Sequence, residues 1–238
     1  MAKNVVIIGA SGSIGSALTR LYSDENSTRV FAFSRAKTNI SLPNVIEDRI
    51  DILNEDSISV VASKYFGGVE IDALIIASGA LHTQDFFPEK SLRDISVEKF
   101  QTIFAINTIG PALVFKHFNK FLSRNRPGIL AAISARVGSI SDNQLGGWYS
   151  YRASKAALNM IIKNTCIEVR RRSPKAIVVG LHPGTVNSKL SKPFQSNVPT
   201  EKLFTNQYAA DKLKNVLDAL NIDDSGKCWD FNGSLILP

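Results

Sequence analysis

Cysteine, histidine and long hydrophobic runs are all scarce in this sequence of 238 residues. The two cysteines, Cys166 and Cys228, have no partner at a metal-ligand spacing, which predicts neither a disulfide framework nor a metal site. The three histidines also lack such a spacing, so we expect no bound metal. No apolar run approaches the ~18 residues of a membrane-spanning helix, and the N-terminal segment lacks the layout of a signal peptide. We therefore expect a cytoplasmic protein without a membrane partner.

Positive charge is in excess: 28 Lys and Arg residues stand against 21 Asp and Glu, a formal net charge of +7. Such a balance raises the question of a nucleic-acid partner. The densest basic group, residues 170–172 with Lys175, falls where a helix should end, and cations there interact favourably with the helix dipole. Because no nucleic-acid-binding motif accompanies the charge, we expect no nucleic-acid partner.

Apolar, β-branched segments alternate with helix-forming segments along the chain. The hydrophobic fraction is 44% and the charged fraction 21%, as in ordinary soluble domains. The expected strands cover residues 4–8, 29–33, 45–52, 71–77, 129–133, 176–181 and 228–231. This alternation runs without a linker, so we expect one α/β domain over residues 1–238. The predicted fold is doubly wound (Rossmann), with a mostly parallel sheet of about seven strands flanked by helices.

A glycine-rich turn follows the first expected strand directly and leads into a helix. The candidate cofactor-binding residues of this turn are Gly9, Ser11, Gly12, Ser13, Ile14 and Gly15. Glycines allow the backbone to approach a pyrophosphate, and the helix N-terminus offers free N–H groups and a positive dipole end. The order strand, glycine turn and helix is typical of a dinucleotide site. A tight turn without a ligand is the alternative.

The second expected strand ends at Ser34-Arg35, where an NAD site usually places an acidic residue that binds the ribose 2′-hydroxyl. Arg35 stands there instead, and a guanidinium matches a 2′-phosphate bidentately. The sequence therefore predicts NADP(H) rather than NAD(H), with Ser34 and Arg35 as cofactor contacts. An exposed loop arginine without a ligand is the alternative.

Two further segments mark positions near a nucleotide. The fourth strand ends in Ser78-Gly79, a small-residue turn that lets a nucleotide lie close to the backbone. The helix that begins near Ser96 carries Asn107 four residues before Pro111. Both residue types disfavour a helix interior, so we expect a kink there, with Asn107 free for a structural or a functional role.

Tyr151 and Lys155 are four residues apart in a helix-forming segment, so they share one helix face. A cation close to a phenol favours the phenolate and is expected to lower the pKa of Tyr151 from about 10. Such a phenol can give or take a proton. A surface tyrosine and lysine without a function is the alternative for this pair alone.

Taken in order, these segments resemble the short-chain dehydrogenase/reductase family across essentially the whole chain. The matching pieces are the glycine turn, Asp51-Ile52, residues 107–110, the serine-bearing fifth strand, Tyr151 with Lys155, and residues 183–186. Residues 137–140 and the Gly146-Gly147 pair look most like the C-factor and Sniffer-type carbonyl reductase branch.

The resemblance implies NAD(P)-dependent reduction of a carbonyl or oxidation of an alcohol. Tyr151 is then the proton donor, Lys155 lowers its pKa and holds the nicotinamide ribose, and Asn107 places a water in a proton relay. Asp51 and Ile52 contact the adenine. The nicotinamide is bordered by Pro183, Gly184, Thr185 and Val186. The family often pairs through the helices that carry Asn107 and Lys155, so a homo-oligomer, a dimer or a tetramer, is expected.

Three departures from the family pattern stand out. Ser13 follows Gly12 where the second glycine is usual, and Ala77-Ser78-Gly79 replaces an asparagine-rich turn. The third concerns catalysis: Ala135 aligns with the catalytic serine. The missing hydroxyl is supplied by Ser134 in a shifted register, by Ser139 from the loop, or by no residue.

Two functions follow as hypotheses. The first is an NADPH-dependent reductase of an aldehyde, ketone or quinone. The second is an NADP(H)-binding signalling or regulatory protein with little turnover. Retention of Tyr151, Lys155 and Asn107 favours the enzyme, whereas Ala135 favours the sensor. Apolar loop residues predict an apolar or aromatic substrate; they are Leu81, Phe86, Phe87, Trp148, Tyr149, Leu190 and Phe194.

Overall fold

The computed structural model describes residues 2–38 and 40–238, and its centre is an eight-stranded sheet with the strand order β10-β9-β6-β5-β4-β1-β2-β3. The strands are β1 (Lys3–Ile8), β2 (Thr28–Ser34), β3 (Val45–Arg49), β4 (Ala73–Ile76), β5 (Gly128–Ile133), β6 (Ala176–His182), β9 (Cys228–Asp230) and β10 (Leu235–Ile236). Neighbouring strands pair in parallel except β9 with β10. A separate two-stranded pair joins β7 (Thr185–Val186) and β8 (Leu203–Phe204).

The expected fold class is confirmed, with differences at its edges. The sheet has eight strands because the C-terminal residues turn back as β10, an antiparallel partner that follows no crossover helix. The third strand, expected over residues 45–52, ends at Arg49. Asp51 and Ile52 therefore lie in the turn that follows the strand in the sequence.

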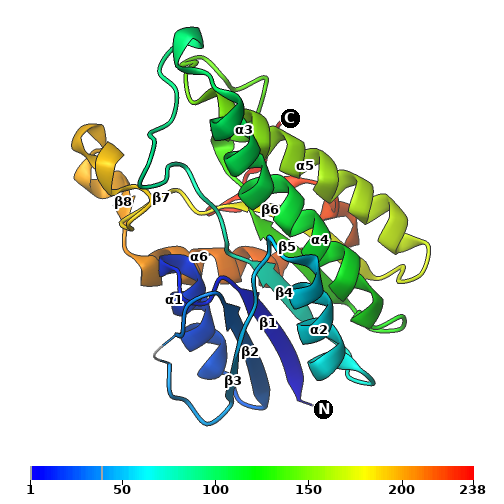
Figure 1. Cartoon of the computed structure of the whole chain (residues 1–238). Coiled ribbons are helices and arrows are strands. Elements are labelled where there is room, and N and C mark those ends of the chain that lie inside the picture. Colours follow the sequence, from blue (N-terminus) through cyan, green and yellow to red (C-terminus); the bar gives the residue numbers. More distant parts are fainter. Residues whose placement is uncertain (1, 39) are drawn as a thin grey trace.

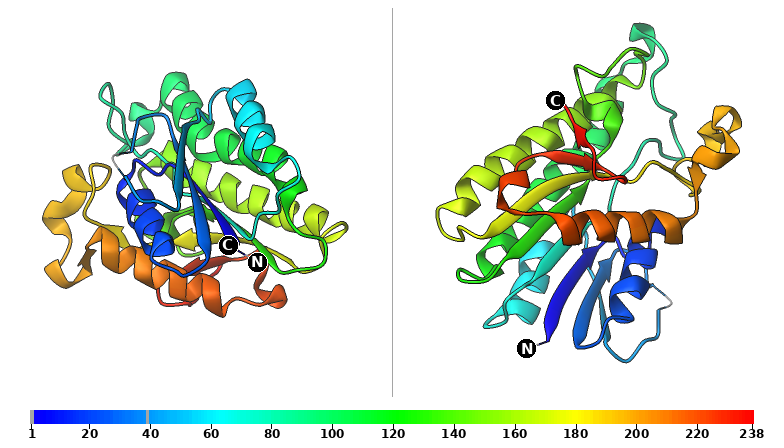
Figure 2. Two further views of the ribbon diagram at one scale, coloured as in Figure 1. Left: turned by 90° about the horizontal axis from the view of Figure 1, so that it is seen from below. Right: turned by 180° about the vertical axis from the view of Figure 1, so that it is seen from behind.

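Helices cover both faces of the sheet (Figures 1 and 2). One face packs against α1 (Ser13–Ser23) and α6 (Asn206–Ala219), and the other against α2 (Glu55–Phe66), α4 (Gly110–Phe118) and α5 (Tyr149–Arg170). Helix α3 (Val97–Phe104) leads into α4. Strand residues alternate between the two cores, as a buried parallel sheet requires: Val6 and Ile8 belong to the α2–α4–α5 side, and Val5 and Ile7 to the α1–α6 side.

The expected distortion near Asn107 is present as a π-helical segment, Ala105–Ile109, between α3 and α4. A π-segment widens the helix by one residue and frees main-chain groups, which is how this chain passes Pro111 without ending the helix. The strand order reverses between β1 and β4. In doubly wound sheets ligands bind beyond the carboxyl ends of the strands at such a point, and the candidate residues gather there.

Candidate active site and cofactor cleft

The glycine turn after β1 is shaped by close backbone approach. Gly9 has φ +91°, and a Cβ on Gly15 would lie 2.2 Å from the Gly9 carbonyl oxygen, so neither position accepts a side chain without displacing backbone. Helix α1 begins at Ser13 with Gly12 as its N-cap, and no side chain caps its first N–H groups. These N–H groups therefore remain available to an anion.

A cleft of about 520 Å³ opens from this turn. It is lined by Gly9, Ser11, Gly12, Ser34, Arg35, Ala36, Ile50, Ile52, Leu53, residues 77–80 and Ile106. Arg35 is exposed at the carboxyl end of β2, and no carboxylate lies within 4.0 Å of it among the described residues. Its guanidinium is thus free to bind a phosphate at the cleft rim.

Asp51 and Ile52 take different places at this cleft. Ile52 is 7% exposed and forms part of the wall, and a Cβ on Gly110 would meet its side chain at 2.9 Å. The Asp51 carboxylate accepts a hydrogen bond from the Leu53 N–H at 3.0 Å, and its own N–H donates to the Ser57 hydroxyl. Ile52 therefore presents an apolar surface to a ligand, while Asp51 fixes the turn that holds Ile52 in place.

Asn107 is fully buried and joins three segments that are distant in the sequence. Its Oδ1 accepts a hydrogen bond from the Ala80 N–H at 2.8 Å, and its Nδ2 donates to the Ala80 carbonyl at 2.8 Å and to the Ser154 hydroxyl at 3.1 Å. Both N–H donors of the amide are occupied, so any water bound by this side chain must donate to Oδ1. The π-segment thereby connects the loop after β4 with α5.

Tyr151 and Lys155 lie on the first two turns of α5 and line a second cavity that is described below. The Lys155 ammonium is 5.8 Å from the centroid of the Tyr151 ring, and it donates a hydrogen bond of 2.9 Å to the Ile133 carbonyl. A Cβ on Gly79 would lie 3.4 Å from Asn107 Oδ1 and 3.6 Å from Lys155 Nζ. Gly79 lines the cleft, so both groups lie next to its wall.

Burial governs the protonation of this pair. It raises the pKa of Tyr151 to about 12 and lowers the pKa of Lys155 to about 8, because both groups are withdrawn from water and each loses stability in its charged form. The expected lowering of the Tyr151 pKa by Lys155 is therefore wrong for this structure. At neutral pH the phenol is protonated and the amine is mostly an ammonium.

The two hydroxyls proposed to replace the family serine both make hydrogen bonds within the protein, and Ser134 also lines the cavity that contains Tyr151. Ser134 donates its hydroxyl hydrogen to Asn159 Oδ1 at 2.7 Å. Asn159 follows Tyr151 by eight residues, about 12 Å along the axis of α5. Ser139 accepts from the Asp142 N–H at 3.1 Å and lies 3.3 Å from the Ser141 hydroxyl, within its own turn. Ala135, 7% exposed, packs in one apolar cluster with Leu81 and Tyr151.

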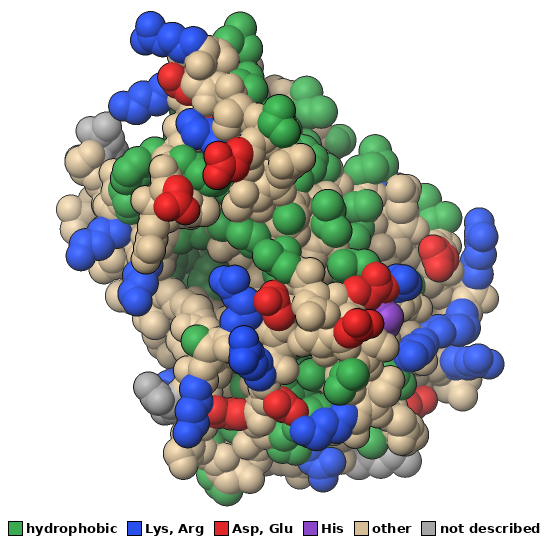
Figure 3. All heavy atoms as spheres, viewed as in Figure 1, with side chains coloured by type: hydrophobic (Ala, Val, Ile, Leu, Met, Phe, Trp, Pro, Cys, Tyr) green, Lys and Arg blue, Asp and Glu red, His purple; other side chains and the backbone are tan. Residues whose placement is uncertain are grey.

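A second cavity of about 270 Å³ adjoins the cleft at Tyr151. Its walls include Leu81, Ala135, Val137, Trp148, Leu190 and Phe194, together with residues 183–186. Gly184 has φ +74°, and a Cβ there would lie 2.5 Å from the Phe204 ring, so this turn too requires glycine. Figure 3 shows a hollow on this face of the molecule, with hydrophobic side chains on its floor and Lys or Arg side chains at its rim.

Four of the seven expected pocket residues line this cavity, and three do not. Phe86, Phe87 and Tyr149 are absent from the wall. Phe87 is 59% exposed and stacks on His82, which itself packs edge-on against Phe194. His82 and Phe87 thus support the wall from behind, a role that the loop sequence alone does not indicate.

Glu89 is a residue that sequence reasoning missed. It is fully buried, its Oε2 accepts from the Ser150 N–H at 3.2 Å and from the Ser150 hydroxyl at 3.0 Å, and its carbonyl oxygen accepts from the Trp148 N–H. Trp148, the N-cap residue of α5, has φ +50° and makes no side-chain cap. The Glu89 carboxylate therefore accepts the hydrogen bonds that an N-cap side chain would otherwise accept, although it lies 61 residues before Ser150 in the sequence. Tyr151 is the residue that follows Ser150.

The residues of the cleft fit a dinucleotide cofactor. The turn at Gly9 and Gly15 is too tight for Cβ atoms, it lines the cleft, and no side chain caps the first N–H groups of α1. Among the described residues, no group of three or more His, Cys, Asp or Glu side chains is placed to hold a metal ion, and none of the helices combines the length and apolar character of a membrane span.

Comparison with known proteins agrees with this geometry. Residues 3–199 match the family model described as short chain dehydrogenase. The 1-hydroxy-2-glutathionyl-2-methyl-3-butene dehydrogenase of Rhodococcus sp. (strain AD45) is 26% identical over 236 residues, covering 98% of each chain. The C-signal protein of Myxococcus xanthus is 32% identical over 148 residues, 60% of this chain and 81% of that one. An NADPH-bound carbonyl reductase from chicken fatty liver shares the fold, with TM-score 0.85, 22% identity and coverage of 100% and 99%.

Proposed function

The chain belongs to the short-chain dehydrogenase/reductase family, and on that premise we propose that it reduces an aldehyde, ketone or quinone to an alcohol with NADPH. This proposal rests on one observation: Tyr151 and Lys155 line the apolar pocket together with Gly79, which also lines the cofactor cleft and has Asn107 Oδ1 and Lys155 Nζ beside it. A protein that only binds the nucleotide has no need of a buried proton donor at that place.

The cofactor would be held along the whole cleft. The α1 N–H groups and the glycine turn bind its pyrophosphate, Ser34 and Arg35 bind the 2′-phosphate, and Ile52 packs against the adenine. Lys155 and residues 183–186 border the nicotinamide end. When bound, NADPH supplies the hydride that the carbonyl carbon accepts. The bound cofactor in the carbonyl reductase from chicken fatty liver supports this assignment.

Tyr151 supplies the proton. With a pKa near 12 the phenol keeps its proton at pH 7 and can transfer it to the oxygen of the carbonyl as negative charge develops there. The Lys155 ammonium nearby stabilises the phenolate that remains. Asn107 is a positioning residue: its amide fixes Ala80, and its Oδ1 is the one atom of the side chain open to a relay water.

The carbonyl oxygen is oriented without the family serine. Ala135 contributes only a methyl group beside Tyr151, and the Ser134 hydroxyl is bonded to Asn159. Tyr151 is then the principal hydrogen-bond donor to the substrate oxygen. We therefore expect the kcat of this protein to be lower than is usual in the family. The apolar wall of the pocket favours an apolar or aromatic carbonyl.

The test is NADPH oxidation with a panel of aldehydes, ketones and quinones, using Tyr151→Phe as the decisive variant. Turnover should fall by roughly 100-fold or more, the usual scale for loss of a general acid. NADPH affinity should be unchanged, because the phenol oxygen is lost and the ring is kept. Tyr149→Phe is the matched control: this tyrosine lies outside the pocket wall, and its variant should retain activity. Undiminished turnover in Tyr151→Phe would refute the proposal.

A second function is favoured by a specific observation. The relative C-signal and the alanine at position 135 both support an NADP(H)-binding signalling protein with little turnover. In that case NADPH should bind to wild type and to Tyr151→Phe alike, while no carbonyl in the panel is reduced by either protein.

We further propose that the protein is a cytoplasmic homo-oligomer. Exposed apolar side chains on the helices that carry the site, Ile109 at 53% and Ile167 at 50% exposure, support association there. Sedimentation velocity tests this proposal, and a single species with the mass of one chain would contradict it.

A further inference from the structure

His82 connects two segments that both line the carbonyl pocket. It directly follows Leu81, a wall residue of the loop after β4. Its Nε2 lies 3.2 Å from the carbonyl oxygen of Leu190, another wall residue, 108 positions further along the chain. Its Nδ1 lies 3.3 Å from the carbonyl oxygen of Thr83, in its own loop. The imidazole therefore ties the segment around Leu190 to the loop after β4.

Both ring nitrogens of His82 face hydrogen-bond acceptors. A neutral imidazole carries one N–H, so its other nitrogen then faces a carbonyl oxygen with a lone pair. The imidazolium carries two N–H groups and donates to both oxygens. Its charge also strengthens the bond to Leu190, since charge-assisted hydrogen bonds are stronger than neutral ones. Protonation of His82 therefore favours the arrangement in which the two segments are joined.

A row of aromatic contacts leads from His82 to the proton donor. The Phe194 ring packs edge-on against His82, at 5.9 Å between centroids, and against Trp148 at 5.1 Å. Trp148 in turn meets the Tyr151 ring at 6.2 Å. Phe194, Trp148 and Tyr151 all line the carbonyl pocket. A displacement of the segment that carries Leu190 and Phe194 would therefore change the wall against which a substrate packs.

No ion pair competes with the two contacts of the His82 ring. Among the described residues, no Asp or Glu oxygen lies within 4.0 Å of either ring nitrogen. The charged side chains nearest along the two segments are Asp85, Lys189 and Lys192, and all three are exposed. One face of the ring stacks on Phe87, at 5.6 Å between centroids. The two carbonyl oxygens are thus the principal polar partners of this imidazole.

We propose that His82 is a positioning residue: its protonation fastens the wall formed by Leu190 and Phe194 and thereby lowers the KM for the carbonyl substrate. This inference rests on the proposed function, because it takes the pocket beside Tyr151 as the carbonyl site. Histidine is the side chain that ordinarily changes charge between pH 5 and 8. The affinity for substrate should therefore increase as the pH falls through that range.

Two amide variants separate the two nitrogens of the ring. In His82→Gln the amide nitrogen takes the place of Nε2 and donates a neutral hydrogen bond to Leu190 at every pH. In His82→Asn the shorter side chain reaches only the place of Nδ1, so the bond to Leu190 is lost at every pH. His117→Gln is the matched control, since it removes a histidine that is paired with Glu55 outside the pocket.

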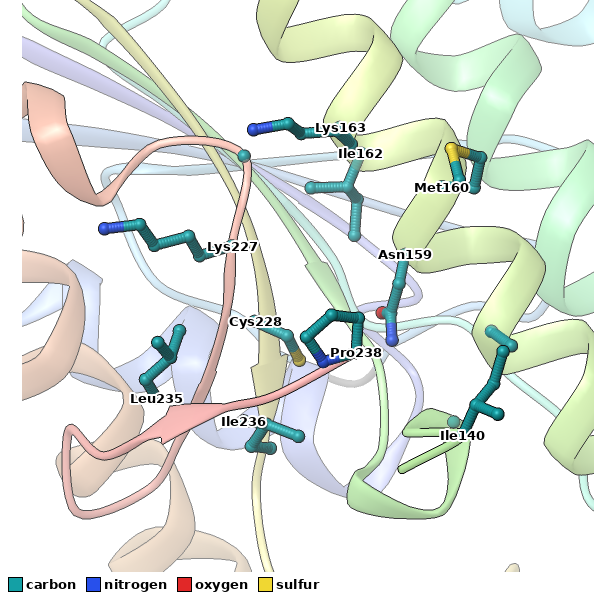
Figure 4. Close-up of a pocket in the computed structure, with 13 residues that line it drawn as sticks. Ile140, Asn159, Met160, Ile162, Lys163, Lys227, Cys228, Leu235, Ile236 and Pro238 are labelled. Carbon is teal, nitrogen blue, oxygen red and sulfur yellow. The ribbon is translucent and has the colours of Figure 1, made fainter. Parts of the chain in front are cut away.

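Trp148 reports the position of this wall. The other tryptophan of the chain, Trp229, lies on β9. Figure 4 shows Cys228 of the same strand at a separate cavity of about 430 Å³, between α5 and the C-terminal strands. Because neighbouring strand residues point to opposite faces, Trp229 packs with the α1–α6 core, outside the lining of the carbonyl pocket. Trp229→Phe therefore leaves Trp148 as the single tryptophan.

The first measurement is quenching of Trp148 fluorescence by acrylamide, an uncharged quencher, in full-length Trp229→Phe protein saturated with NADP⁺. Quenching should be stronger at about pH 7.5 than at about pH 5.5, two values within the range in which histidines titrate, because neutral His82 holds Phe194 less firmly against the indole. The added His82→Gln change should give one intermediate value at both pH values. His82→Asn should give strong quenching at both, and His117→Gln should follow the parent protein.

The second measurement is steady-state reduction of the best carbonyl of the panel with NADPH at the same two pH values. KM should be about fivefold lower at the lower pH, as expected when a charge-assisted hydrogen bond replaces a neutral one. Both His82 variants should lose this trend. Lys155 and His182, whose pKa values burial lowers to about 8 and about 4, also line the pocket, but they are common to all variants. The pH dependence of kcat should be the same in every variant, because His82 is not part of the pocket lining.

Three results would overturn the inference. One is equal quenching of Trp148 at both pH values in the parent protein, and another is a pH trend that persists in His82→Gln. The third is a KM that stays constant while the quenching follows His82, since the histidine would then serve only the loop. Quenching requires no carbonyl reduction. The expected quenching in a protein that reduces no carbonyl would therefore refute the proposed function and leave the bond from His82 to Leu190 established.

Discussion

Arg35 is the residue on which the choice of cofactor rests. It occupies the end of β2 where an acidic residue would bind a ribose 2′-hydroxyl, and it lines the cleft without an acidic partner among the described residues. A free guanidinium at this rim stabilises a 2′-phosphate by charge-assisted hydrogen bonds.

Arg35→Asp should therefore reverse the cofactor preference from NADPH to NADH. The loss in NADPH affinity should be about 1.5–3 kcal/mol, the range for hydrogen bonds to charged groups. Calorimetric titration of both cofactors measures this. If the unmodified protein bound NADPH and NADH equally, Arg35 would have no part in the selection.

Ala135 is the residue that distinguishes this site from its family. Ala135→Ser places a hydroxyl beside Tyr151, and we expect kcat to rise about tenfold, equivalent to 1.4 kcal/mol of added stabilisation of the transition state. Steady-state kinetics with NADPH and the best substrate of the panel measures this rise.

Ser134→Ala is the companion variant. Because its hydroxyl is bonded to Asn159, this change should lower the free energy of unfolding by about 1 kcal/mol and leave kcat within about twofold. A large loss of kcat in Ser134→Ala, together with no gain in Ala135→Ser, would restore Ser134 as the catalytic hydroxyl.

At the scale of single elements, the start of α5 is held from outside. The N-cap residue Trp148 has a left-handed backbone and offers no capping oxygen, so the Glu89 carboxylate accepts the hydrogen bonds of Ser150 instead. Tyr151 follows in the next position. The orientation of the proton donor thus depends on a residue in the loop before α3.

Glu89→Ala should lower the free energy of unfolding by about 1–3 kcal/mol, because it leaves buried donors without a partner. It should also lower kcat while NADPH affinity stays near that of wild type. Glu89→Gln retains an acceptor oxygen and should restore most of kcat. Glu98→Ala, which removes an exposed acid from the first turn of α3, is the control and should change neither quantity. Equal kcat for Glu89→Ala and wild type would show that the cap serves stability alone.

At the scale of the whole molecule, the buried Lys155 reduces stability. Its pKa falls from 10.5 to about 8 on folding, so between these values the unfolded chain binds a proton that the folded chain has released. The free energy of unfolding therefore increases with pH through that window, because the cost of burying Lys155 falls. Below pH 8 the cost is constant, about 3 kcal/mol at 1.36 kcal/mol for each pH unit.

Lys155→Met removes this cost and should make the protein inactive. The gain in its free energy of unfolding over that of wild type should be about 2 kcal/mol larger at pH 7 than at pH 9.5, since 1.5 units of the window have been crossed at the higher pH. Urea unfolding at the two pH values measures this difference. A Lys155→Met difference that is the same at both pH values would contradict the assignment.

Much of the fold is determined locally in the sequence. The run of β-branched residues before Gly9 forms a strand, the glycines require close backbone approach, and the segment after them is helical. Tyr151 and Lys155 share a face because four residues make about one turn. Such features depend on neighbours along the chain, and for this reason the order of elements and the family resemblance could be predicted.

Tertiary structure decided what these residues can do. Burial raises the pKa of Tyr151, although charge alone predicts a lower one, because desolvation depends on everything that packs around the phenol. The partners of Asn107, Glu89 and Ser134 lie 27, 61 and 25 residues away, and no local pattern encodes such contacts. The strand-and-turn order thus follows from the sequence by itself. The direction of each hydroxyl and the protonation of the site come only from the packing of distant segments.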